Sequence, residues 1–228
     1  GTNLMSPAIV DDMLYMVGFD YSLRALNAST GEEQWRVQIA PWPQTEATPT
    51  AYDLNIYLSD ISPVIAGGTA YVTANDGVLY AIDLETREET WRFETDGVAF
   101  LTAPALLDGR IYLPASVMPD FDSNERPGEP IENSTFDGWV YAIDAESGDE
   151  IWTWHVATLR AEGETVGRVS ATSDRLFVDT AGAITMLDPA NGTVIADQLA
   201  PGGQSASLIT TDAIYAYNES GNLQVFQY

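Results

Sequence analysis

The sequence predicts an all-β protein, a β-propeller built from four-stranded antiparallel blades, on three observations. A pattern of strand, tight polar turn and strand recurs along the chain, and its clearest copy is GVLYAIDLETREETW at residues 77–91. Apolar residues alternate with a period of two, and no segment keeps a helical period. A small antiparallel sheet cannot bury both of its faces alone, whereas radially stacked sheets can. We therefore expect one propeller domain over residues 1–228.

Five repeat units align on this pattern. Each contains a strand with an aromatic residue, at Tyr15, Tyr71, Tyr112, Phe177 and Tyr215. The next strand of each unit is expected at residues 22–26, 78–82, 139–143, 183–187 and 223–226. A turn that begins with Asn or Asp follows, and in the second unit Arg87 occupies the place of a positive-φ glycine. The fourth strand is expected to end in a tryptophan that packs between blades, at Trp35, Trp91 and Trp152.

The fifth unit is incomplete, because the sequence stops at Tyr228 before a fourth strand. Five blades could close as a ring with a thin seam, or the chain could form part of a propeller of seven or eight blades. An open propeller exposes unpaired strand edges. The missing strand favours the longer propeller.

The repeat resembles the PQQ-like (pyrroloquinoline-quinone-like) propeller repeat in its small-Pro opening, its Leu-Tyr-Ala-Ile-Asp strand and its terminal tryptophan. The resemblance covers nearly the whole chain, although the fourth and fifth units lack the tryptophan. This repeat occurs in quinoprotein dehydrogenases and in the bacterial β-barrel assembly lipoprotein. The second likeness implies a scaffolding role in the cell envelope, and the first implies PQQ with Ca²⁺. The dehydrogenases are much longer, and many place adjacent cysteines against the cofactor.

The charge is strongly unbalanced, with 34 Asp and Glu against nine basic residues, a net charge of −25. All nine basic residues are arginine. Self-repulsion of this size destabilises a compact protein in dilute buffer, whereas concentrated salt screens it. An acidic, lysine-free surface of this kind is similar to that of proteins from salt-in halophiles. Nucleic acid is not expected as a partner, because phosphate binding requires a basic surface.

Other sequence features limit the class of protein. There is no cysteine, which excludes disulfides and cysteine-based metal sites. The longest apolar run, residues 98–107, is too short to span a bilayer, so no membrane-spanning segment is expected. The chain starts without a signal-peptide pattern. We nevertheless expect an extracytoplasmic or cell-surface location from the family resemblance.

Three long insertions interrupt the repeats, at residues 37–61, 115–137 and 153–169. Because strand direction alternates, all three fall on the same face of the predicted blades. Long loops on a rigid scaffold commonly carry binding sites. The candidate binding residues on this face are Trp42, Tyr52, Tyr57, Phe121, Trp154 and His155.

The second insertion contains a candidate Ca²⁺ site. Asp120, Asp122 and Asn124 stand at alternate positions, as at the start of an EF-hand loop. The sixth position is Glu125 instead of glycine, and the twelfth is Ile131. The match to an EF-hand loop is therefore incomplete. Apart from this candidate Ca²⁺ site, we expect no cofactor.

Catalytic motifs are missing from the sequence: no nucleophile elbow, phosphate loop or histidine-based metal motif is present, and His155 is the single histidine. We therefore expect a non-enzymatic propeller that binds or scaffolds a protein or peptide through the insertion face. The alternative is a fragment or relative of a PQQ-dependent quinoprotein dehydrogenase.

The charge balance predicts a salt response. The melting temperature should rise steeply between low and molar KCl, because screening weakens repulsion among the 34 acidic residues. Thermal unfolding followed by circular dichroism across a KCl series measures it. A flat response would contradict the halophile interpretation.

Overall fold

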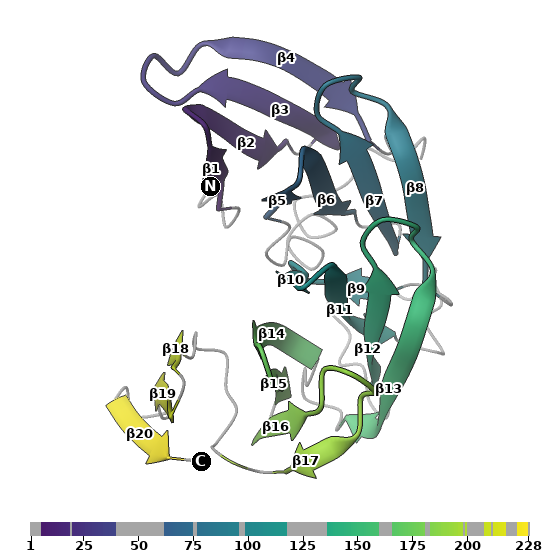
Figure 1. Ribbon diagram of the computed structural model, residues 1–228, viewed down its shortest axis with the longest axis vertical. Coiled ribbons are helices and arrows are strands. Elements are labelled where there is room, and N and C mark those ends of the chain that lie inside the picture. The colour runs from purple at the N-terminus through teal and green to yellow at the C-terminus, as the bar shows by residue number, and fades with distance from the viewer. Residues whose placement is uncertain are drawn as a thin grey trace, which may run out of the picture. The chain divides into compact units, whose positions relative to one another are not determined.

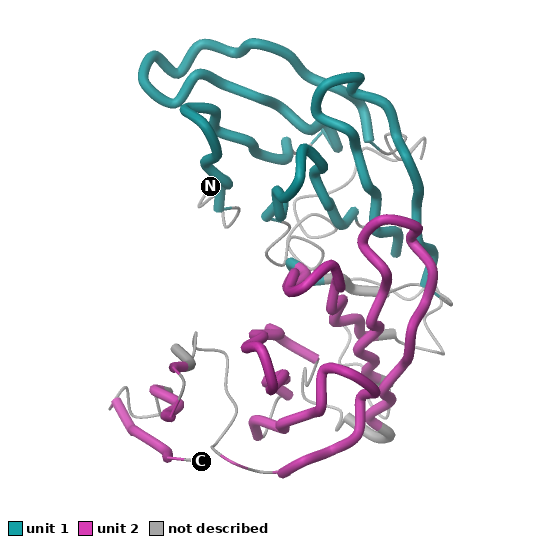
Figure 2. The backbone as a smooth tube through the Cα atoms, in the orientation of Figure 1, with its two compact units in different colours: residues 1–103, 125–128 teal, residues 104–124, 129–228 magenta. Residues whose placement is uncertain are grey.

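The computed structural model describes residues 6–18, 20–39, 62–74, 77–95, 99–117, 136–159, 166–180, 183–197, 199, 208–210, 212–217 and 223–227. The chain divides into two compact units, one comprising residues 1–103 and 125–128 and the other residues 104–124 and 129–228 (Figure 2). Within the described ranges there is no helix, so none that could cross a membrane is found there.

The first unit contains two four-stranded antiparallel sheets, each with its strands in chain order (Figure 1). The first sheet, blade 1, consists of β1 (Ala8–Val10), β2 (Met13–Val17), β3 (Ser22–Asn27) and β4 (Glu33–Gln38). Blade 2 consists of β5 (Val64–Ala66), β6 (Thr69–Thr73), β7 (Val78–Asp83) and β8 (Glu89–Glu94). A short strand, β9 (Ala99–Leu101), follows.

The second unit contains three antiparallel sheets. Blade 3 follows the path β10 (Ala105–Leu107), β11 (Arg110–Val117), β12 (Phe136–Asp144) and β13 (Glu150–Leu159). Blade 4 consists of β14 (Val166–Thr172), β15 (Arg175–Thr180), β16 (Ala183–Leu187) and β17 (Val194–Ala196). Blade 5 has three described strands, β18 (Leu208–Ile209), β19 (Ala213–Tyr217) and β20 (Leu223–Gln227). The predicted all-β class, five repeats and four-stranded blades are thus confirmed.

Two features of the predicted elements were wrong. The fourth strands do not end at their tryptophans: Trp35 pairs with Ala25, and the ladder continues to Gln38 opposite Ser22. The insertions are shorter than expected, since residues 153–159 and 166–169 lie in β13 and β14, and residues 115–117 and 136–137 in β11 and β12. The physical reason is strand pairing: residues 137–144 of β12 pair with β11, residues 136–143 pair with β13, and β14 pairs with β15 from Val166 onward, so these strands extend further than their counterparts.

In each turn between a third and a fourth strand, the side chain of the first turn residue accepts hydrogen bonds from backbone N–H groups of the same turn. Asp83 Oδ1 accepts hydrogen bonds from the backbone N–H groups of Thr86 (2.7 Å) and Glu85 (2.9 Å). These bonds favour the ionised carboxylate, so they lower the pKa of Asp83, and the corresponding bonds lower the pKa of Asp144. Asn27 forms the same turn in blade 1 through its amide oxygen.

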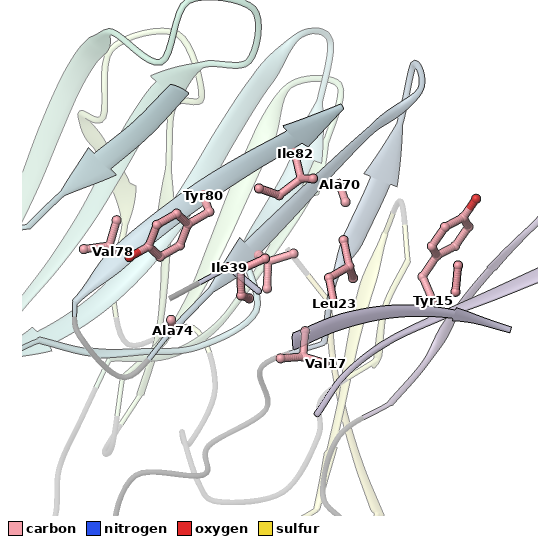
Figure 3. Close-up of a cluster of buried hydrophobic side chains, with 11 residues drawn as sticks. Tyr15, Val17, Leu23, Ile39, Ala70, Ala74, Val78, Tyr80 and Ile82 are labelled. Atoms are coloured by element: carbon pink, nitrogen blue, oxygen red, sulfur yellow. The ribbon is translucent and has the colours of Figure 1, made fainter. Parts of the chain in front are cut away.

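Neighbouring blades pack through apolar sheet faces. In the first unit, side chains of β2 and β3, such as Tyr15 and Leu23, meet side chains of β6 and β7, such as Ala70 and Tyr80, in one buried cluster (Figure 3). Trp35 packs against this cluster, with its ring 6.0 Å from that of Tyr15. Similar clusters join blade 3 to blade 4 and blade 4 to blade 5.

One carbonyl joins blades 3 and 4. The oxygen of Pro189, in the β16–β17 turn, accepts hydrogen bonds from Trp152 Nε1 (3.1 Å), Arg110 Nη1 (3.1 Å) and the Tyr112 hydroxyl (3.2 Å). Gly192 lies directly against the Trp152 indole, because a Cβ on this glycine would be 2.6 Å from Trp152 Cε3. The β16–β17 turn therefore needs a residue without a side chain at this place.

A glycine pair tests this contact. Gly192→Ala should destabilise the protein more than Gly31→Ala, since both glycines have a φ of +72° but nothing lies within 4 Å of a Cβ on Gly31. The positive φ should cost about 1–2 kcal/mol in either variant, and overpacking against Trp152 should add about 1–3 kcal/mol to Gly192→Ala. Urea unfolding in concentrated KCl measures both losses, and equal losses would contradict the proposed contact.

Candidate functional site

Strand alternation gives every blade two distinct ends. In blades 1 to 4 the first-to-second and third-to-fourth turns lie at one end, which we call the turn end. The second-to-third connections and the connections to the next blade leave from the other end, which we call the loop end. The described strands that border the three predicted insertions meet them at the loop end.

Most of the predicted site residues lie outside the described ranges. These are the binding candidates Trp42, Tyr52, Tyr57 and Phe121 and the metal candidates Asp120, Asp122 and Asn124. Within the described ranges, no group of three or more His, Cys, Asp or Glu side chains could hold a metal ion. The structure therefore places two of the predicted binding residues, Trp154 and His155.

Trp154 and His155 are consecutive residues of β13 and so point to opposite faces of blade 3. The Trp154 side chain is half-buried and packs against the cluster that joins blades 3 and 4, with Val140 among its members. His155 is exposed and stacks on Trp139 across the β12–β13 pair, with ring centroids 4.7 Å apart and an interplanar angle of 28°. Of the two side chains, that of His155 is the more exposed.

The two insertions of the second unit share one root at the loop end of blade 3. Ser116, near the end of β11, is fully buried, and its Oγ accepts a 2.8 Å hydrogen bond from the backbone N–H of Val166 at the start of β14. The first residue borders the insertion after β11, and the second borders the insertion after β13. This bond joins the start of the insertion that follows β11 to the end of the insertion that precedes β14.

The turn end contains a hollow that the sequence reasoning did not find. A crevice of about 500 Å³ lies between blades 3 and 4. Its charged and hydroxyl lining comes from the turns and from β11 and β15: Asp108, Arg110, Tyr112, Ser173, Asp174, Arg175 and Asp188. Burial raises the pKa of Tyr112, whose hydroxyl already donates to Pro189. The available sequence signal was the recurrence of aspartate at the turn positions 108, 174 and 188.

The two arginines that line the crevice form contacts within the protein. Arg175 pairs with Asp174 at 3.0 Å, and Arg110 bonds to the Pro189 carbonyl. Asp188 accepts from the N–H of Ala190 within its own turn. The crevice is thus a polar seam between two blades.

A family model described as outer membrane protein assembly factor BamB matches residues 20–227. Among curated proteins, the serine/threonine-protein kinase AfsK of Streptomyces griseus is 29% identical over 157 residues, 67% of this chain and 15% of the kinase. The quinohemoprotein alcohol dehydrogenase of Comamonas testosteroni is 23% identical over 154 residues, 65% of this chain and 19% of the dehydrogenase. The chain spans less than a fifth of either protein.

Solved structures show the same fold. BamB from Moraxella catarrhalis superposes with a TM-score of 0.65 at 17% identity, covering 98% of this chain and 58% of that protein. Quinohemoprotein alcohol dehydrogenase from Comamonas testosteroni gives 0.68 at 18% identity, covering 98% of this chain and 41% of that protein. Together with the family match, these likenesses confirm the predicted PQQ-like β-propeller.

Proposed function

The chain belongs to the family of outer membrane protein assembly factor BamB, and from this membership we propose that it is a non-enzymatic module that binds or scaffolds a protein or peptide. The proposed binding surface is the loop end of blade 3, where the chain outside the strands in the predicted insertions 115–137 and 153–169 leaves the blade, and the predicted insertion at residues 37–61 leaves blade 1 at its own loop end. The proposed setting is extracytoplasmic, in the cell envelope of a halophile. The family description and the net charge of −25 support this setting.

The observation that carries the proposal is the shared root of the second and third insertions. A binding loop works best when its base is rigid. Here the base consists of the long ladders of β11, β12 and β13, locked by the buried Ser116–Val166 hydrogen bond. Trp139 and His155 form an aromatic pair beside this base, and the His155 side chain is exposed.

The second candidate function is that of a fragment or relative of a PQQ-dependent quinoprotein dehydrogenase. The likeness in fold to quinohemoprotein alcohol dehydrogenase favours it. The sequence argues against it, because the chain has no cysteine to form the adjacent pair that many of those enzymes place against the cofactor. The scaffolding proposal accounts for the family match without a cofactor.

Site-specific photo-cross-linking tests the binding surface. A photoreactive amino acid at position 155, at the loop end of blade 3, should give a discrete adduct with another protein in the cells that make this chain. The same amino acid at position 173, an exposed turn-end position, should not. Mass spectrometry of the adducts reads the result. Equal adducts at both positions, or none at position 155, would contradict the assignment of the loop end.

A cofactor titration tests the alternative. Adding PQQ with Ca²⁺ to the protein in concentrated KCl should leave its absorption spectrum and melting temperature unchanged. A bound ligand raises the melting temperature by mass action. A saturable rise, or a shift in the PQQ absorption band, would favour the dehydrogenase relationship over the scaffold.

A further inference from the structure

The turn between β3 and β4 of blade 1 differs from its counterparts at two positions (Figure 1). Blade 1 begins this turn with Asn27, where the next three blades have aspartate, at Asp83, Asp144 and Asp188. Two residues later blade 1 has Ser29, where those blades have Glu85, Glu146 and Ala190. The two differences together create an Asn-x-Ser sequence at residues 27–29, which is the acceptor sequence of N-linked glycosylation.

The turn uses only the oxygen of the Asn27 amide. Oδ1 accepts hydrogen bonds from the backbone N–H groups of Ser29 (3.0 Å) and Thr30 (2.9 Å) and from the Thr30 hydroxyl (3.2 Å). In blade 2, Asp83 Oδ1 accepts the same three bonds. An ionised carboxylate is the stronger acceptor, so the turn itself gives asparagine no advantage. The nitrogen that asparagine adds, Nδ2, makes no hydrogen bond within the described part of the chain.

The Ser29 hydroxyl has no role in the turn either. Its Oγ forms no hydrogen bond with the residues that the structure describes, and the side chain is exposed. The hydroxyl that the turn does use belongs to Thr30, which donates to Asn27 Oδ1 and accepts from the N–H of Glu32 (3.3 Å). The acceptor sequence, in contrast, requires a hydroxyl at residue 29. The two groups that the turn leaves unused are therefore the two that glycosylation needs.

The same two positions are accessible in a blade that has a neighbour in front of it. Asn27 is half-buried and Ser29 is exposed. The turn of blade 2 packs against blade 1, since Arg87 lies over the Trp35 ring. In that turn the corresponding Asp83 is still half-buried, and the residue two positions later is still exposed. Packing between blades therefore leaves this part of the turn open to an enzyme.

We propose that Asn27 is the attachment site of an N-linked oligosaccharide. Nδ2 loses one hydrogen as a proton and bonds to the anomeric carbon of a lipid-phosphate-linked oligosaccharide. The bond between that carbon and the phosphate oxygen breaks, and the lipid phosphate leaves with the electron pair, so nothing is oxidised or reduced. The modified amide keeps Oδ1 as an acceptor, and the three hydrogen bonds of the turn persist.

A second acceptor sequence, at residues 191–193, lies in the β16–β17 turn and is the weaker candidate. Asn191 Nδ2 donates to Asp188 Oδ2 (3.3 Å), and its Oδ1 accepts from the N–H of Thr193 (2.9 Å). The middle residue, Gly192, is buried against the Trp152 indole. Both ends of the Asn191 amide are thus engaged in the turn, whereas the Asn27 nitrogen is not.

An oligosaccharide at Asn27 stands at the turn end of blade 1. The predicted insertion at residues 37–61 leaves the same blade at its loop end. The modification therefore leaves the proposed binding end of this blade uncovered. The inference rests on the extracytoplasmic setting proposed above, because the acceptor sequence is modified in exported proteins.

Mass spectrometry of the protein purified from the cells that make it naturally tests the proposal. Trypsin cleaves after arginine, so Asn27 falls in the peptide of residues 25–36, which contains no other asparagine. The wild-type peptide should carry the added mass of sugar residues, and fragmentation should localise it to Asn27. Ser29→Ala should abolish this added mass, because the acceptor sequence is lost. Ser29→Thr is the matched control and should keep it, and both variants keep the hydrogen bonds of the turn.

Three results would overturn the proposal: a bare wild-type peptide, sugar that persists in Ser29→Ala, or an oligosaccharide on Asn191 with none on Asn27. Cell fractionation separates this failure from that of the proposed setting. A bare peptide on protein recovered outside the cytoplasm contradicts the glycosylation alone. A bare peptide on protein recovered from the cytoplasm contradicts both.

Discussion

The burial of sheet faces between neighbouring blades is the constraint on which the rest of the structure depends. Each blade is too small to hide both of its faces, so the strand pattern places apolar side chains on both sides and the next blade covers one of them. Leu23 and Ala25 of blade 1 meet Ala70 and Val72 of blade 2 in this way. Contacts between turns and tryptophans of neighbouring blades add to this packing.

The tryptophan contact shows how repeats diverge while keeping this packing. In blade 3, the Trp152 indole donates to the Pro189 carbonyl and lies against Gly192 of the next blade. In blade 1, the corresponding Trp35 lies under the guanidinium of Arg87, 5.5 Å from its ring centroid. Arg87 keeps a φ of 65°, a conformation that favours glycine. A cation–π contact of about 0.5–1 kcal/mol helps offset the strain of that conformation.

Sequence reasoning recovered the fold because the repeat encodes local strand and turn patterns. The strand predicted at residues 183–187 coincides with β16, and the turns that begin at Asn27 and Asp83 form as their residues indicate. The ends of the fourth strands were missed, because strand pairing beyond Trp35 depends on register with β3 and not on local composition. The crevice at the turn end was missed for a related reason. It forms where turns far apart in the chain meet, so loop length gave no indication of it.

Six of the described arginines are engaged in contacts within the chain. Arg24, Arg36, Arg92 and Arg175 pair with nearby carboxylates, Arg87 covers Trp35, and Arg110 bonds to Pro189. Each of these six cations stabilises a turn, a strand edge or a blade contact. In concentrated salt, long-range attraction is screened in any case. In the proposed halophilic setting, recognition would therefore rest on short-range contacts, such as those of rooted loops and exposed aromatic rings.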